Sequence, residues 1–425
     1  MISQTISPAK TAIDSTFRWQ IALLVSVAIA ISYLDRQTLP WAIKAIQVDI
    51  PFNNQIKAAL DSAFLLTYGL MYVGGGMLLD RLGTRRGFLV IMIFWSLACA
   101  SHGLAGGILA LAASRLLLGV GEGGGFPAAT RAVTECFPVN DRAMAMGIIN
   151  AGTAVGAVIA PPLIAVVLTN VNWLGLAPWR WVFFLTGALG LLWTIWWWHS
   201  YQTPEQSGET PSPVSEPKIS LGSLLQHRET WAVIGAKFLS DGAWYFYLFW
   251  LPKYLFDAFQ LDIKTAGSIG WIPYAASGVG CLVGGGFSTW LLKRGVSVNW
   301  SRKLALGASA ALMPWVMFVP QLHSVGWVIF IFSLAFFGQQ SWSTLVMILP
   351  TDMISKRAVG TLAGLVGFGG AMGGVLLGQI VGWLRDHGYS YTPALVISGS
   401  MHIAAFILIC LAIPKIQPLK ISTNQ

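Results

Sequence analysis

The chain has 425 residues, of which 55% are hydrophobic and only 10% are charged. A soluble globular protein carries about 25% charged residues to cover its surface, so this composition excludes an ordinary soluble protein and an intrinsically disordered one. The 20 Trp, 22 Phe and 46 Gly are typical of a membrane protein, because aromatic rings anchor membrane interfaces and small residues let helices pack closely. The four cysteines form no CxxC pair, so we expect no metal site, no disulfide framework and no cofactor.

The apolar stretches have the length of membrane-crossing helices. A bilayer core about 30 Å thick needs roughly 20 helical residues, and stretches of that size lie between charged or proline-rich breaks. We predict twelve spans, near residues 19–42, 57–79, 87–108, 109–133, 143–169, 179–198, 231–256, 266–292, 302–320, 324–350, 358–384 and 392–413. The fold class is therefore an all-α membrane protein.

A polar stretch divides the spans into two groups of six. Residues 199–230 are rich in Pro, Ser and Glu, which predicts a flexible linker. The predicted organisation is a tail at 1–18, an N-terminal six-helix bundle at 19–198, the linker at 199–230, a C-terminal six-helix bundle at 231–413 and a tail at 414–425.

The positive charges predict the orientation of the chain. With twelve spans, both termini and the linker share one side, and 17 of the 26 lysines and arginines fall on that side against six on the other. Cytoplasmic loops of membrane proteins carry the excess of Lys and Arg, so we expect the termini and linker in the cytoplasm. The net charge of +9 then reflects orientation, and we expect no nucleic-acid partner.

Two matches indicate that the halves are related. The segment from Val73 to Gly76 (VGGG) recurs at Val283 to Gly286, 210 residues later, and Arg142-Ala143 has a counterpart 215 residues later in Arg357-Ala358. Two nearly equal offsets close to half the chain length favour an internal duplication, which is typical of transporters with a binding site between their halves.

Two motifs resemble signatures of the major facilitator superfamily. Residues 76–86 read GMLLDRLGTRR, with Asp80, Arg81, Arg85 and Arg86 between two spans, and residues 115–121 read RLLLGVG. The resemblance implies two pseudo-symmetric six-helix bundles that alternate access to a central site. An Asp at a helix end beside several Arg can form charge pairs that stabilise one conformation of the protein and break in another. We therefore assign these four residues to a conformational gate.

A narrower resemblance rests on residues 33–39 (YLDRQTL) and 119–127 (GVGEGGGFP). Both segments resemble the anion:cation symporter family, which includes bacterial sugar-acid transporters and animal sialic acid, vesicular glutamate and phosphate carriers. Residues 238–241 (FLSD) and 249–255 (FWLPKYL) resemble the hexuronate transporters of that family most.

Four ionisable residues stand out inside the predicted spans, where a charge is costly and marks a functional site by default. Arg115 and Glu122 are seven residues apart, so they share one helix face about 10 Å apart along the axis. Asp35 and Arg36 are adjacent and point about 100° apart, so only one can face the pore, and we assign that position to Arg36. An arginine suits a substrate carboxylate because its planar fork makes two parallel hydrogen bonds.

The resemblance implies a role for each of the four. Arg36 would bind the substrate carboxylate, Asp35 and Glu122 would carry protons, and Arg115 would be the partner of Glu122. The alternative is that all four form a buried ion-pair network that only stabilises the first and fourth spans.

Further candidate substrate contacts are polar or aromatic side chains within spans. In the N-terminal half these are Tyr33, Tyr68, Asn150 and Thr153, and in the C-terminal half Trp244, Tyr247, Gln339 and Gln340, which could hold a polyol by stacking and hydrogen bonding. Lys237 and Asp241 are four residues apart and predict an intrahelical or gate ion pair. Asp61 lies near the outer end of its span and is expected to reach water, and His402 is expected to be packed or bonded to water.

The sequence therefore predicts a monomeric transporter, and not an enzyme, that imports a sugar acid with protons across a bacterial plasma (inner) membrane. One alternative keeps the fold but makes the protein a facilitator, an exchanger or a Na⁺-coupled carrier of phosphate or an amino-acid anion. A polytopic membrane enzyme is a second alternative, but it needs catalytic carboxylates or histidine clusters at a membrane face, and the charges within spans lie at mid-span instead.

Overall fold

The computed structural model describes residues 15–201, 221–353 and 359–417, and every regular element within these ranges is helical. The predicted all-α class is confirmed. The helices before the linker are α1 (Ser15–Asp49), α2 (Asn54–Ser101), the 3₁₀ turn η1 (His102–Leu104), α3 (Ile108–Gly123), α4 (Gly125–Cys136), α5 (Val139–Asn170) and α6 (Pro178–Ser200). Those after it are α7 (Leu221–Leu225), α8 (Arg228–Phe259), α9 (Ile263–Gly270), α10 (Ile272–Lys293), α11 (Val298–Ala310), the 3₁₀ segment η2 (Pro314–Gln321), α12 (Val325–Met353), α13 (Val359–Asp386) and α14 (Thr392–Ala412).

The helices correspond to the twelve predicted spans, but several are joined or broken. Ten segments of the described residues are long and apolar enough to cross a membrane, and α8 and the first half of α2 complete the twelve. The fourth predicted span is α3 plus α4, which part at Gly124, the eighth is α9 plus α10, and the ninth is α11 plus η2. Hydropathy averaged over a whole span does not locate these breaks, because each joined pair is apolar enough as a unit to cross a membrane.

Gly83 lies at the boundary between the second and third predicted spans. Its φ angle is +73° and its ψ is 167°, so the helical conformation is interrupted there, and α2 consists of two helices that meet at a kink. A side chain is strained at this φ, and glycine is not. The glycine of the GxxxDRxGxRR segment is thus needed for the turn between two spans.

Two glycines of α3 bring it into close contact with both parts of α2. A Cβ atom on Gly119 would lie 2.2 Å from Thr67 Oγ1, and one on Gly121 would lie 2.4 Å from Trp95 Cβ. No larger residue fits, which is how small residues allow membrane helices to approach. The close packing places the next side chain, Glu122, deep in the bundle.

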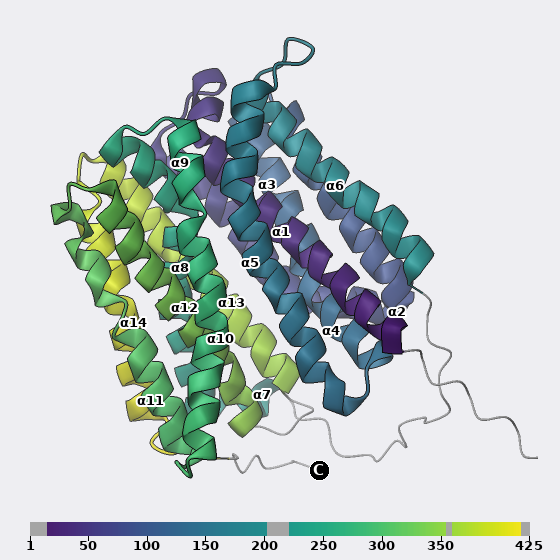
Figure 1. The fold of residues 1–425 in the computed structure, drawn as a ribbon, viewed down its shortest axis with the longest axis vertical. Helices are drawn as coiled ribbons and strands as arrows, with labels where there is room; N and C mark the ends of the chain where they lie inside the picture. Colours follow the sequence, from purple (N-terminus) through teal and green to yellow (C-terminus); the bar gives the residue numbers. More distant parts are fainter. Residues whose placement is uncertain (1–14, 202–220, 354–358, 418–425) are drawn as a thin grey trace, which may run out of the picture.

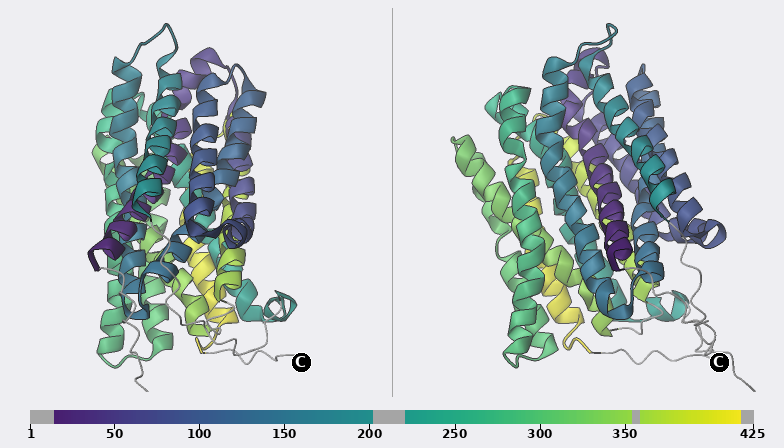
Figure 2. Two further views of the ribbon diagram at one scale, coloured as in Figure 1. Left: turned by 90° about the vertical axis from the view of Figure 1, so that its right-hand side faces the viewer. Right: turned by 45° about the vertical axis from the view of Figure 1, so that its right-hand side comes forward.

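The helices form two bundles side by side (Figures 1 and 2). In Figure 1 the bundle of α1–α6 runs from purple to teal on the right, and that of α8–α14 is green to yellow on the left. Between the bundles, α2 packs on α13, and α5 packs on α9 and α10. We call the end where α1 begins and α6 ends the linker end, and the opposite end the closed end.

Some predicted boundaries differ from the structure. Helix α1 begins at Ser15, within the predicted 1–18 tail, and the predicted 199–230 linker is shorter, because α6 continues to Ser200 and α8 begins at Arg228. Residues 202–220 lie outside the described ranges, as do Arg357 and Ala358 of the second repeat match. The glycines of the first match have different surroundings: a Cβ on Gly75 would lie 2.8 Å from Gly124, whereas one on its counterpart Gly285 would lie 3.7 Å from Thr344 of α12.

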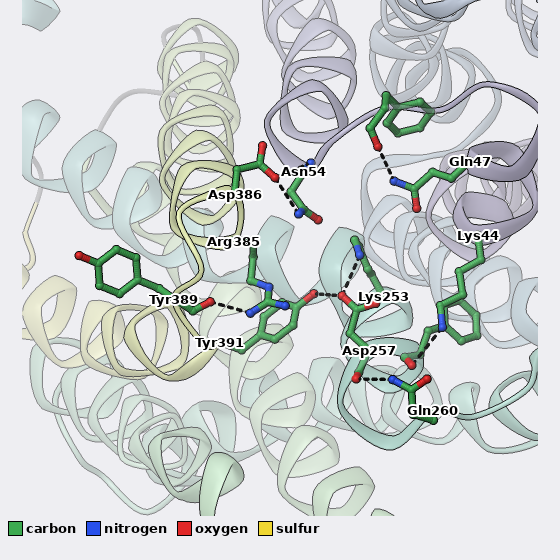
Figure 3. A network of polar contacts seen from close by, with 12 residues as sticks. Lys44, Gln47, Asn54, Lys253, Asp257, Gln260, Arg385, Asp386, Tyr389 and Tyr391 are labelled. Atoms are coloured by element: carbon green, nitrogen blue, oxygen red, sulfur yellow. Dashed lines mark hydrogen bonds and ion pairs between the residues drawn. The ribbon is translucent and has the colours of Figure 1, made fainter.

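Polar contacts join the two halves at the closed end (Figure 3). The carboxylate of Asp386, the last residue of α13, accepts hydrogen bonds from the backbone N–H groups of Asn54 (3.0 Å) and Gln55 (2.8 Å), the first residues of α2. A carboxylate stabilises a helix N-terminus because it satisfies free N–H groups and opposes the positive end of the helix dipole. Asp386 therefore caps a helix of the other half.

Further contacts extend this closure. Lys44 Nζ donates to the carbonyl oxygen of Phe256 (3.0 Å), and Gln379 donates to Ser62 Oγ (2.8 Å). Deeper in the protein, Tyr274 Oη donates to Gln37 Oε1 (2.9 Å). Sequence reasoning did not single out these residues, because the partners of each contact are 212 to 332 positions apart in the chain.

We predict that Asp386→Ala weakens this closure. Losing a helix-capping carboxylate costs about 1 kcal/mol, so the fraction of molecules open at the closed end should rise roughly fivefold. The measurement is thiol labelling of Leu65→Cys, a buried position on α2 near Gly374 of α13, in a background without native cysteines. Asp262→Asn is the control, since Asp262 caps only its own helix; equal labelling rates in the two variants would contradict the prediction.

Candidate functional site

A cavity of about 1050 Å³ lies between the two halves. Its wall extends from side chains in the middle of the helices to Arg131, Thr134 and Met347 near the linker end. Of the predicted substrate contacts, those that line the cavity are Tyr33, Tyr68, Asn150, Thr153, Trp244, Gln339 and Gln340. Tyr247 is not part of the lining; its ring packs against Phe332 and Phe336 of α12.

Arg36 is paired with Glu122 beside the cavity and does not line it. Its Nη2 and Nε atoms donate to Glu122 Oε2 at 2.8 and 3.2 Å, and Ser32 Oγ donates to the same oxygen at 2.8 Å. Arg36 and Glu122 are each 2% exposed. This contact joins α1 to the C-terminal end of α3, where the glycine packing described above places Glu122.

Aromatic rings separate the Arg36 guanidinium from the cavity. Its Cζ atom lies 4.5 Å from the ring centre of Tyr68, 4.7 Å from Tyr33 and 5.2 Å from Phe64. The negative face of an aromatic ring attracts a cation, more strongly where water is absent. Since Tyr33 and Tyr68 line the cavity, an anion in the cavity would reach Arg36 by displacing these rings.

Arg115 has a different partner from the one expected. Its Nη2 atom lies 3.5 Å from Asp61 Oδ1, and Asp61 Oδ2 accepts a 2.7 Å hydrogen bond from Lys57 Nζ. The pairing of Arg115 with Glu122 was therefore wrong, because seven residues separate them by about 10 Å along the helix. The expectation that Asp61 reaches water was also wrong: it is 2% exposed.

Asp35 faces away from Arg36, as adjacent helix positions require. Its Oδ2 atom accepts a hydrogen bond from Trp95 Nε1 (3.1 Å) on α2, and the residue is fully buried. It therefore has a separate environment within the N-terminal half, and it does not line the cavity.

The C-terminal half presents its own polar cluster to the cavity. Lys237 Nζ contacts Asp241 Oδ1 at 2.9 Å and donates to Ser343 Oγ at 2.7 Å. Gln339 Nε2 donates to Asp241 Oδ1 at 3.3 Å, and Gln339 Oε1 contacts His402 Nε2. His402 is fully buried with its ring against Trp342, so the expectation that it is packed is confirmed. Its link to Gln339 could not be read from the sequence because 63 residues separate them.

The motif residues assigned to a gate lie at the linker end. Arg85 donates to the carbonyl oxygen of Trp198 on α6 (2.7 Å) and lies over its ring. Arg81 and Arg86 are exposed, and the side chain of Asp80 lies outside the described residues. Arg85 thus contacts its own half.

Comparisons with known proteins agree with this geometry. A family model described as "Major Facilitator Superfamily" matches residues 25–378 of this chain. The chain is 28% identical to a hexuronate transporter of Escherichia coli K12 over 390 residues, covering 87% of this chain and 88% of the relative. It is also 28% identical to a D-galactonate transporter of Escherichia coli O6:H1 over 411 residues, covering 92% and 94%.

A solved structure supports the fold. A bacterial homologue of the human lysosomal transporter Spinster, in an inward-facing and unoccupied conformation, aligns with a TM-score of 0.73 at 19% identity, covering 94% of this chain and 96% of that one. Two six-helix bundles around a central cavity define a multi-pass membrane transporter. The chain belongs to the Major Facilitator Superfamily.

The buried triad of Lys57, Asp61 and Arg115 predicts an asymmetric response to mutation. Asp61→Asn leaves two buried cations without a carboxylate and should cost about 3–5 kcal/mol of stability. Lys57→Met leaves the Arg115–Asp61 pair and should cost less. The measurement is the thermal unfolding midpoint of the purified protein in detergent.

Asp352→Asn is the matched control, because its pair with Arg302 is partly exposed and should contribute about 1 kcal/mol or less. An Asp61→Asn variant as stable as the wild type, or more stable than Lys57→Met, would show that the triad is not the electrostatic unit described.

Proposed function

We propose that this protein imports a sugar acid, such as a hexuronate or aldonate, coupled to protons by alternating access. The observation that carries the proposal is the Arg36–Glu122 pair, a guanidinium held by one carboxylate behind two cavity-lining tyrosines. The relatives named as hexuronate and D-galactonate transporters support the substrate class. The amide groups of Asn150, Gln339 and Gln340 suit the hydroxyl groups of such a substrate.

The pair suggests how substrate and proton are linked. A substrate carboxylate that reaches Arg36 competes with Glu122 for the same two donors. Glu122 then loses its countercharge in a buried position, where a neutral carboxyl is favoured, and it takes up a proton. Binding of the anion and of the proton thereby favour each other, which is the requirement for symport.

The setting follows from the charge distribution. We place the protein in the bacterial inner membrane with the linker end and both termini in the cytoplasm, because the Lys and Arg excess lies on that side. The cavity then reaches toward the cytoplasm, and the closed end faces the periplasm. We propose that the protein works as a monomer, without a cofactor and without enzymatic activity.

Uptake by proteoliposomes tests the proposal. With radiolabelled galacturonate outside, an imposed pH gradient (acid outside) without Na⁺ should drive accumulation, and a protonophore should abolish it. Arg36→Lys should reduce uptake at least about tenfold, because an ammonium cannot make the two parallel hydrogen bonds of the guanidinium. Arg18→Lys, at a partly exposed pair with Asp141, is the control. Uptake that does not depend on the pH gradient would refute proton symport and favour a facilitator. Uptake that requires Na⁺ would refute it and favour a Na⁺-coupled carrier.

Glu122→Gln should separate binding from coupling. The amide cannot take up a proton, so exchange of labelled for unlabelled sugar acid should persist while accumulation driven by the pH gradient is lost. Glu229→Gln is the matched control, because Glu229 also pairs with an arginine, Arg228, but does so outside the cavity lining. Undiminished accumulation by Glu122→Gln would remove this residue from the proton path.

A further inference from the structure

Lys237 is a cation that faces the cavity directly. It lies on α8 of the C-terminal half, is 7% exposed, and lines the cavity together with Asp241 and Ser343. Arg36, in contrast, is separated from the cavity by Tyr33 and Tyr68. The first cation that an anion meets on the C-terminal wall is therefore Lys237.

The Lys237 ammonium has more N–H donors than it has partners among the described residues. An ammonium carries three N–H donors, and two of them are directed to Asp241 Oδ1 (2.9 Å) and Ser343 Oγ (2.7 Å). Within the part of the chain that the structure describes, the third N–H has no partner, so it is available to a ligand in the cavity. A carboxylate is the strongest partner for it, because hydrogen bonds between charged groups are roughly twice as strong as neutral ones.

Neighbouring helices hold the Lys237 site in place. Asp241 accepts a second hydrogen bond from Gln339 Nε2, and Gln339 is fixed in turn by His402 of α14. The ammonium is therefore anchored by groups from α8 and α12, with α14 behind them. A lysine buried only to pair with Asp241 gains little over apolar packing, so its place on the cavity wall points to a ligand.

The two walls of the cavity thus each hold a paired cation. Arg36 with Glu122 lies behind the N-terminal wall, and Lys237 with Asp241 lies on the C-terminal wall. Arg131, near the linker end, also lines the cavity and is paired with Glu135. The N-terminal wall also carries the amide group of Asn150, and the C-terminal wall that of Gln340. This arrangement fits a polyol chain with a carboxylate at each end.

We propose that Lys237 is a second carboxylate-binding residue and that it gives the protein a preference for dicarboxylic sugar acids (aldarates). The proposal rests on the proposed function, since it takes Arg36 as the site of the first carboxylate. Lys237 binds the second carboxylate from the opposite half, so the substrate bridges the two halves. A monocarboxylic acid of the same chain length places a hydroxyl at Lys237 and binds more weakly.

The test compares galactarate with galactonate. Their shared hydroxyl groups have the same configuration, but galactarate carries two carboxylates and galactonate carries one. Affinities are measured by isothermal titration calorimetry on the purified full-length protein in detergent. The wild type should bind galactarate at least about tenfold more tightly than galactonate. Lys237→Met alone leaves Asp241 uncompensated, so the main variant is Lys237→Met with Asp241→Asn, which keeps the cluster neutral.

The double variant should bind both acids equally, with galactonate affinity within about threefold of the wild type. Lys303→Met is the matched control, because Lys303 is a buried lysine of the same half that bonds the Pro414 carbonyl outside the cavity; it should keep the preference for galactarate. A wild type without that preference, or a double variant that loses both acids equally, would overturn the role of Lys237. A wild type that binds neither acid would overturn the sugar-acid function itself.

Discussion

A guanidinium keeps its charge when it is buried, so each arginine inside a membrane bundle needs a carboxylate close by. Arg36 and Arg115 both meet this requirement within the N-terminal half, one through Glu122 and the other through Asp61. The Phe64 ring lies against both guanidinium groups, with centroid distances of 5.2 and 4.6 Å. Because the two cations share one ring, the positions of α1, α2 and α3 are fixed relative to one another at the centre of the bundle.

The glycines of α3 make this arrangement possible. With side chains at Gly119 or Gly121, α3 could not lie against Thr67 and Trp95 of α2, and Glu122 would move away from Arg36. The two glycines of the RxxxGxG segment therefore act through helix packing. The packing has an electrostatic effect, because a displaced Glu122 would leave Arg36 buried without a countercharge.

The sequence predicted the spans, the two halves of six and the presence of charges at mid-span, because these depend on local hydropathy and on periodicity along one helix. It did not predict which charges pair. The family resemblance implied that Arg115 pairs with Glu122, yet each has its partner on another helix, Asp61 on α2 and Arg36 on α1. Helix geometry describes neighbours along the chain, whereas the pairing depends on the distance between helices, which glycine packing determines.

The same limit applies to the cavity wall. Tyr33 and Tyr68 were candidates as aromatic residues within spans, but their position between Arg36 and the cavity follows only from the crossing of α1 and α2. Similarly, the spacing of Lys237 and Asp241 predicted an ion pair, and the structure adds Ser343, Gln339 and His402 from two other helices. The spacing in the sequence predicts the Lys237–Asp241 pair, whereas the residues around the pair depend on how the helices pack.

The distribution of contacts also bears on how the halves move. Among the described residues, each ion pair joins two residues of the same half, as for Arg36–Glu122, Arg115–Asp61 and Lys237–Asp241. The direct polar contacts between halves at the closed end are hydrogen bonds, such as those of Asp386 and Lys44 with backbone groups. Breaking a buried ion pair costs several kcal/mol, whereas a hydrogen bond at a helix end can be exchanged for one to water at a net cost of about 1 kcal/mol. The interactions that are costly to break therefore keep each half rigid, and those between the halves are the ones that a change of conformation can exchange.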